Sequence, residues 1–218
     1  GVVYDKYEPE KPKVLFRQLR TVEALEGDKG YRVEKVFKDL DGKVALTELW
    51  IYRGGRVVKY EIDQRQIGAS GSFEVRGDRI HFSYKGPGED KAETDSEKYT
   101  ANTMSTDELA HFVQSNWSEI MNGETLKIRL PVVDRLETVG FKFFKEREET
   151  RSDGEYVVVK MKPSSFFIAA IVDPILFYFK KDGWHELKEV DGRTAPKIKK
   201  NGDWENLDAI LKLKTKEL

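Results

Sequence analysis

The sequence has no cysteine, no long apolar run and no excess of charge of one sign. The absence of cysteine among its 218 residues excludes disulfides, cysteine metal sites and a thiol nucleophile. No stretch reaches the ~18–20 consecutive apolar residues that a membrane-spanning helix needs. The 38 basic and 39 acidic residues are interleaved and leave a net charge of -1, without the basic patch that nucleic-acid binding requires. We therefore expect neither a transmembrane segment in this chain nor a nucleic-acid partner.

Motifs that carry chemistry are also missing. The three histidines, His81, His111 and His185, do not fall at metal-ligand spacing, and H-E-x-x-H, G-x-S-x-G, P-loop and G-x-G-x-x-G patterns do not occur. We predict no catalytic residue, no metal site and no cofactor, and hence a protein that is not an enzyme. An enzyme with a scattered site is the remaining alternative, and it would require His185 or perturbed carboxylates to converge in a pocket.

Aromatic residues and strand-like alternation are what the sequence does have. It contains 12 Phe, 9 Tyr and 4 Trp, although only 39% of its residues are hydrophobic. From residue 31 onward, apolar residues recur at every second position between turn signals such as Asp-Gly and Gly-Gly. In RIHFSYK, for example, Ile80, Phe82 and Tyr84 share one face. This pattern predicts a mainly β (α+β) fold: one curved antiparallel meander or half-barrel of about ten strands, with 1–13 as an extended lead-in and 14–218 as a single domain.

Three segments are expected to be helical. Residues 14–26 place apolar side chains near helical spacing, and residues 105–121 do so after an S-x-x-E capping box formed by Ser105 and Glu108. Residues 164–172 follow Pro163 and precede Asp173-Pro174, which ends a helix. We expect the second and third helices to cover the hollow face of the sheet. The most polar segment, 86–100, is expected to be an exposed hairpin arm or loop.

The third of these segments is apolar on every side. Residues 163–172 carry no charge, and the strand ILFYF that follows has apolar groups on both faces. Such a segment is either buried on all sides, as a strut in a filled core, or faces something other than water, as the lip of a ligand cavity or against a bilayer surface. The aromatic residues expected to line a cavity in the hollow of the sheet are Trp50, Tyr52, Phe141, Phe143, Phe166, Phe167, Phe177 and Phe179.

A resemblance adds to this pattern. RLPVVDRLETVGFKFFKERE, VVVKMKPSSFFIAAIVDPILFYF and DGRTAP resemble a group of uncharacterised proteins exported by Gram-negative bacteria. Their sheets are similar in style to the lipoprotein-carrier (LolA/LolB-like) superfamily, a curved half-barrel with helices over its hollow face. The resemblance covers residues 31–213 in pattern and is specific over 126–196.

The resemblance implies a location in the periplasm or at the outer membrane, with a signal peptide removed. It also implies a lipid, acyl chain or lipoprotein as partner, and it transfers no functional residues. We expect an envelope binding module for an apolar or lipidic ligand. The alternative is a structural, partner-binding envelope protein with a filled core and no small-molecule ligand.

Overall fold

The computed structural model describes residues 1–7, 12–27, 30–170 and 172–214. Its strands are β1 (Val2–Asp5), β2 (Val14–Ala24), β3 (Gly30–Lys38), β4 (Val44–Arg53), β5 (Arg56–Gln64), β6 (Ala69–Arg76), β7 (Arg79–Lys85), β8 (Glu93–Lys98), β9 (Leu126–Val132), β10 (Glu137–Arg151), β11 (Gly154–Pro163), β12 (Ile175–Lys180), β13 (Leu187–Lys200) and β14 (Asp203–Lys212). Its helices are α1 (Leu109–Ser115), α2 (Trp117–Met121), the 3-10 turn η1 (Val133–Arg135) and α3 (Phe166–Ala169).

All fourteen strands belong to one sheet in the order β8-β7-β6-β5-β4-β3-β2-β1-β14-β13-β12-β11-β10-β9. Each strand pairs antiparallel with its neighbours, and β1 pairs with both β2 and β14, which brings the two ends of the chain together in the middle of the sheet. The sheet is not closed, because β8 and β9 are its two edges and the segment with α1 and α2 connects them. The expected curved antiparallel meander is confirmed, with fourteen strands instead of about ten.

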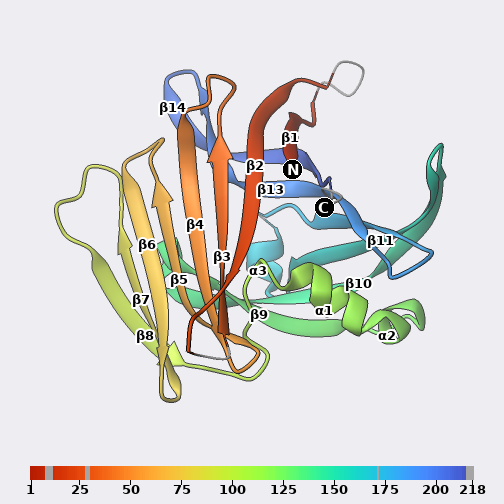
Figure 1. Ribbon diagram of the computed structural model, residues 1–218, viewed down its shortest axis with the longest axis horizontal. Coiled ribbons are helices and arrows are strands. Elements are labelled where there is room, and N and C mark those ends of the chain that lie inside the picture. The colour runs from red at the N-terminus through yellow and green to blue at the C-terminus, as the bar shows by residue number, and fades with distance from the viewer. Residues whose placement is uncertain (8–11, 28–29, 171, 215–218) are drawn as a thin grey trace.

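The sheet bends so that its two halves cross (Figure 1). In this view β3 to β8 run upright and β9 to β11 run across, with α1 and α2 lying along β9 and β10. The two edges of the sheet come near each other without pairing as strands. The Thr138 amide at the start of β10 donates a hydrogen bond to Glu97 Oε1 of β8 at 3.0 Å.

The expected helix over 14–26 is wrong, since these residues form β2. Leu19 and Val22 lie at helical spacing but are more than half exposed, so they form no buried stripe. β2 instead hydrogen-bonds to β1 on one edge and to β3 on the other, and this tertiary pairing overrides a weak local preference. The lead-in expected over 1–13 contributes β1, and the segment expected to be a polar arm contributes the charged edge strand β8.

The helix expected over 105–121 is present as α1 and α2, with a break at Asn116. Half of the predicted capping box forms, because the Ser105 amide donates to Glu108 Oε2 at 2.7 Å. The Ser105 hydroxyl bonds instead to the Tyr52 hydroxyl at 2.6 Å. The helix expected over 164–172 is the single turn α3, and position 171 of that expectation lies outside the described residues.

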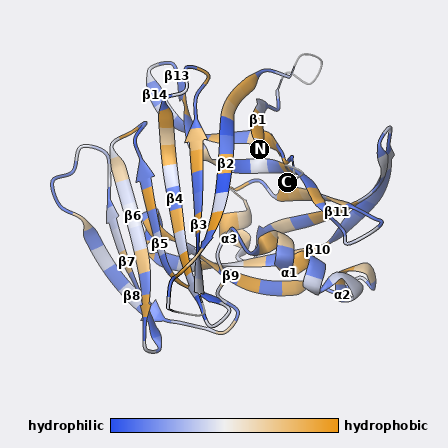
Figure 2. Cartoon of the chain, in the orientation of Figure 1, coloured by the Kyte–Doolittle hydropathy of each residue, from blue (hydrophilic) through white to orange (hydrophobic). Residues whose placement is uncertain are grey.

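The buried residues form two separate hydrophobic cores on the inner face of the sheet. In Figure 2 hydrophobic and hydrophilic residues alternate along β3, β4 and β5, as expected for strands with one buried face. A first core is built on the inner faces of β2 to β7 and on β14. In the second core, α1 and α2 pack on the inner faces of β9 to β12. A cavity lies between the two halves.

Candidate functional site

A cavity of about 510 Å³ lies between the two halves of the sheet. Its volume falls within the range of small-molecule sites, about 300–1,000 Å³. One wall comes from β4 to β7, the other from β9, η1 and β10, and α3 contributes Ile168 together with Val172 just beyond it. The turn η1 closes one side, since a Cβ added at Gly71 would lie 2.8 Å from Val133 Cγ2. Arg193 and Lys197 of β13 and Asn206 of β14 also line it, so the cavity is formed by segments that are far apart in sequence.

An aromatic row forms the wall on the side of β4 to β7. Trp50 contacts Tyr60 with ring centroids 5.1 Å apart, and Tyr60 contacts Phe73 at 5.5 Å. These rings come from three adjacent strands, because Trp50 is the cross-strand partner of Tyr60, which in turn is the partner of Phe73. Phe141 of β10 and Leu130 of β9 face them from the other half. The apolar part of the cavity can thus accept an aliphatic or aromatic group.

A row of polar residues crosses the same inner face. Arg20, Lys35 and Glu48 are successive cross-strand partners on β2, β3 and β4, followed by Ile62 on β5. Lys35 breaks the alternation of apolar residues in its strand because its ammonium has a partner inside, Asp107 Oδ1 at 2.9 Å. The same ammonium lies 4.7 Å from the centre of the Trp50 ring. The charged row and the aromatic row therefore meet at Trp50 and Glu48.

Asp107 joins this row to the segment that precedes α1. Its two carboxylate oxygens accept hydrogen bonds from Arg20 Nε at 2.8 Å and Arg20 Nη2 at 2.9 Å, in addition to the Lys35 contact. Burial alone would raise the pKa of Asp107, but the bonds from Arg20 and the charge of Lys35 outweigh it and lower the pKa to about 2. Asp107 is therefore ionised at neutral pH and fastens the approach to α1 onto β2 and β3.

Glu48 is the buried carboxyl group of the cavity. Its side chain lines the space, and its Oε1 accepts a hydrogen bond from the Tyr60 hydroxyl at 2.9 Å. Burial raises the pKa of Glu48 above its usual value, and the nearby charge of Lys35 and the Tyr60 hydrogen bond only partly oppose this. A buried carboxyl of this kind in a cavity identifies a candidate site for recognition of a polar group.

The residues expected to line the cavity occupy four different environments. Trp50 and Phe141 line it, whereas Tyr52 is buried nearby and bonds to Ser105. Phe166 and Phe167 on α3 are 83% and 84% exposed and are not part of the cavity lining. The remaining three, Phe143, Phe177 and Phe179, lie in the second core beneath the helices.

The second half of the hollow is filled rather than open. Trp117 of α2 packs edge-on against Phe179 at 5.9 Å, and Phe112 of α1 does so against Phe143 at 5.8 Å. The apolar face of the two helices thus occupies the space that a ligand would need. The hollow face of the sheet therefore carries a packed core under α1 and α2 and a cavity between η1, α3 and the aromatic row.

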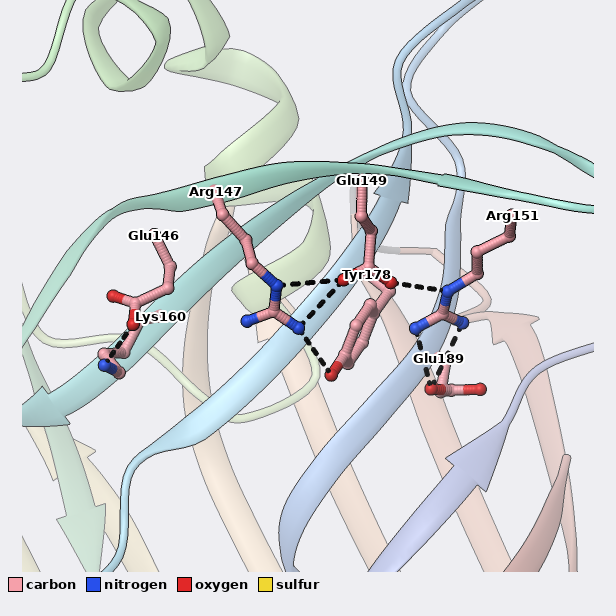
Figure 3. Close-up of polar contacts among 7 residues, drawn as sticks. All are labelled: Glu146, Arg147, Glu149, Arg151, Lys160, Tyr178 and Glu189. Carbon is pink, nitrogen blue, oxygen red and sulfur yellow. Dashed lines mark hydrogen bonds and ion pairs between the residues drawn. The ribbon is translucent and has the colours of Figure 1, made fainter. Parts of the chain in front are cut away.

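The outer face of the second half has a different chemistry (Figure 3). Past a bulge between Lys145 and Arg147, the residues Arg147, Glu149 and Arg151 of β10 lie over Tyr178 of β12. Arg147 and Arg151 each donate to Glu149, at 2.9 and 2.6 Å, and the Arg151 guanidinium lies 4.2 Å from the Tyr178 ring centre. The guanidinium groups cover an apolar strip on β11 and β12, which explains why ILFYF is apolar on both faces.

The histidines do not form a catalytic group. His185 lies in a turn and stacks on Trp117 with ring centroids 3.8 Å apart, its buried Nδ1 without a partner among the described residues. His81 is on the outer face of β7, and His111 on α1 lies 3.4 Å from the Ser115 hydroxyl. Over the described ranges, no group of three or more His, Cys, Asp or Glu is placed to hold a metal ion. Glu48 and His185 belong to different parts of the fold.

The sequence did not lead us to predict three residues of the site, Glu48, Asp107 and Tyr60. For Glu48, however, the pattern of the surrounding residues indicated a buried polar group. Glu48 occupies the inward position between Leu46 and Trp50, in an alternation otherwise made of apolar residues. A charged residue at such a position indicates a buried polar contact. Asp107 and Tyr60 had no comparable signal, because Asp107 resembles an ordinary charge at the start of a helix and Tyr60 an ordinary core aromatic.

No protein-family model and no curated protein matches the chain. Among solved structures, it is similar to a β-barrel-like protein of the domain of unknown function DUF1849 from Brucella abortus, with a TM-score of 0.48 and 9% sequence identity. The match covers 99% of this chain and 97% of that one. Among the described residues, no helix has the length and apolar character needed to cross a membrane.

Proposed function

We propose that this chain is a non-enzymatic binding module that holds an apolar or lipidic molecule in the cavity between the two halves of its sheet. The observation that carries the proposal is the cavity of about 510 Å³ with an aromatic row on one wall. A filled core would have no such space, and protein interiors normally leave few voids larger than a water molecule. The second core supplies that comparison within the same chain, since there Phe112 and Trp117 of the helices pack against Phe143 and Phe179.

The setting that fits this function is the bacterial envelope. An acyl chain or a lipidated partner matches the apolar wall, and the LolA/LolB-like resemblance of the sequence points to the same class of ligand. We propose a periplasmic or outer-membrane-associated protein on this basis. The charged edge strand β8 argues against the alternative of a partner that adds a strand there, because charges on an edge discourage pairing.

The lip of the cavity offers a matched pair of variants. Ile168 lines the cavity and Phe166 is exposed, yet both belong to the same turn of helix. We expect Ile168→Asp to weaken binding of a fluorescent acyl-chain probe by about tenfold or more, because an aspartate in an apolar site is costly. Phe166→Asp should change the affinity by less than about twofold. Fluorescence titration measures both affinities, and thermal melting checks that both variants fold. Equal effects of the two variants would argue against binding in the cavity.

A further inference from the structure

One oxygen of a buried carboxyl group in the cavity has no protein partner. Glu48 is 8% exposed, and its Oε1 is bonded to Tyr60. Across the described ranges, its Oε2 accepts no hydrogen bond, and it is not among the enclosed side-chain atoms that lack a partner. Glu48 lines the cavity, so a ligand bound there can reach this carboxyl group.

The surroundings explain why this oxygen stays free. Lys35 is the cross-strand neighbour of Glu48, but its ammonium bonds to Asp107, which also holds Arg20. Tyr60 can donate only one hydrogen bond, and Oε1 accepts it. Trp50, Ile62 and Phe73, which also line the cavity, donate no hydrogen bond to Oε2, and Lys35 lies over the Trp50 ring. The cations that line the cavity have other partners: Arg135 bonds to Glu137, Arg193 to Asp208 and Lys197 to Asn206. The cavity therefore presents an acceptor without its donor.

A ligand that fills the cavity either donates a hydrogen bond to Glu48 Oε2 or leaves this oxygen unpaired. If the ligand displaces water from Glu48 and brings no donor, it leaves a buried acceptor unsatisfied, which is unfavourable. If it brings a carboxylate, two hydrogen-bond acceptors meet at Oε2 with no donor between them. A hydroxyl or ammonium group at that point would instead donate to Oε2 and complete the coordination of Glu48.

We propose that the cavity selects an apolar molecule carrying a hydrogen-bond donor, a hydroxyl or an ammonium group, at the end that reaches Glu48, and that it rejects the corresponding carboxylate. This inference rests on the proposed function and names the ligand class of the same cavity. Sites built to pair a donor or an acceptor discriminate strongly against analogues that lack it, whereas apolar walls discriminate weakly. Glu48 thus determines specificity, while the aromatic row supplies most of the contact area.

The test compares a long-chain alcohol, the amine of the same chain length and the matching fatty acid, each displacing a fluorescent acyl-chain probe below its micelle concentration. We expect the wild-type protein to bind the alcohol and the amine about tenfold more tightly than the acid. In Glu48→Gln the amide oxygen still accepts from Tyr60, but an NH2 donor replaces the acceptor Oε2, so the preference should fall below about threefold. Glu61→Gln, on the same strand pair but exposed and paired with Lys59, should retain the wild-type preference.

The outcomes separate the two proposals. If neither the probe nor any of the three compounds binds, the proposed function fails. If all three compounds bind the wild-type protein with equal affinity, the function stands and the role of Glu48 is overturned. A preference that persists in Glu48→Gln also overturns it. Thermal melting shows that each variant is folded before the affinities are compared.

Discussion

Replacing Phe179 by alanine is expected to lower the free energy of unfolding by about 3–5 kcal/mol. Phe179 is fully buried in the second core, where it contacts Trp117 and where helix α2 shields it from water. Its removal leaves a void under the helices, because the surrounding strands are held by pairing on both sides and relax only in part. Urea unfolding followed by circular dichroism measures the loss.

The exposed phenylalanines provide the control for this prediction. Phe166→Ala and Phe167→Ala should each change the free energy of unfolding by less than about 0.5 kcal/mol, since both side chains are more than four-fifths exposed. Phe166, Phe167 and Phe179 cannot be distinguished by their sequence pattern, because all three are aromatic residues of one apolar region. A loss at Phe166 as large as that at Phe179 would mean that α3 packs into the core, contrary to the structure.

Replacing Asp107 by asparagine is expected to cost about 3 kcal/mol of unfolding free energy. The change leaves Lys35, whose side chain is 14% exposed, and Arg20 without the carboxylate that both contact. The partly exposed Arg20 keeps the loss at the low end of the range for broken buried pairs. Asp63→Asn is the matched control, because Asp63 and its partner Arg65 are both more than half exposed and such pairs contribute little.

The same variant should change the dependence of stability on pH. The pKa of Asp107 is lowered to about 2 from its usual 3.8, so the folded state releases this proton more readily than the unfolded chain. Its contribution, roughly 2 kcal/mol, is therefore complete above pH 4 and disappears as the pH falls towards 2. Urea midpoints measured from pH 7 to pH 2 should show the wild-type advantage over Asp107→Asn shrinking in that window. An advantage that does not change with pH would rule out the ionised carboxylate as its source.

The regular parts of the fold could be predicted from the sequence. In RIHFSYK the alternation correctly places Ile80 and Phe82 inside, and the capping box at Ser105 correctly marks the approach to a helix. Both signals are local: one depends on the pleat of a strand and the other on four consecutive residues. β2 was mispredicted because what makes it a strand is its pairing with β1 and β3, which its own residues do not encode.

The site could be predicted only in part, for a related reason. An inward aromatic residue has the same sequence pattern whether a helix covers it, as at Phe179, or a cavity does, as at Trp50. The difference depends on where α1, α2 and α3 pack against the sheet. Asp107 contributes to that packing, because it fixes the segment before α1 through hydrogen bonds with Arg20, 87 positions away in the chain. Glu48 was visible as a charge on an inward face, but its free oxygen depends on Lys35 bonding to Asp107 instead.

Quenching of Trp50 fluorescence by a long-chain alcohol brominated along its chain shows whether a ligand occupies the cavity. Among the described tryptophans, Trp50 lines the cavity, Trp117 lies in the second core, and Trp184 and Trp204 are exposed. We expect quenching that saturates with ligand concentration, that is largely lost in Trp50→Phe and that is unchanged in Trp184→Phe. Absence of saturable quenching, or quenching that survives in Trp50→Phe, would contradict a ligand held in the cavity between the two halves of the sheet.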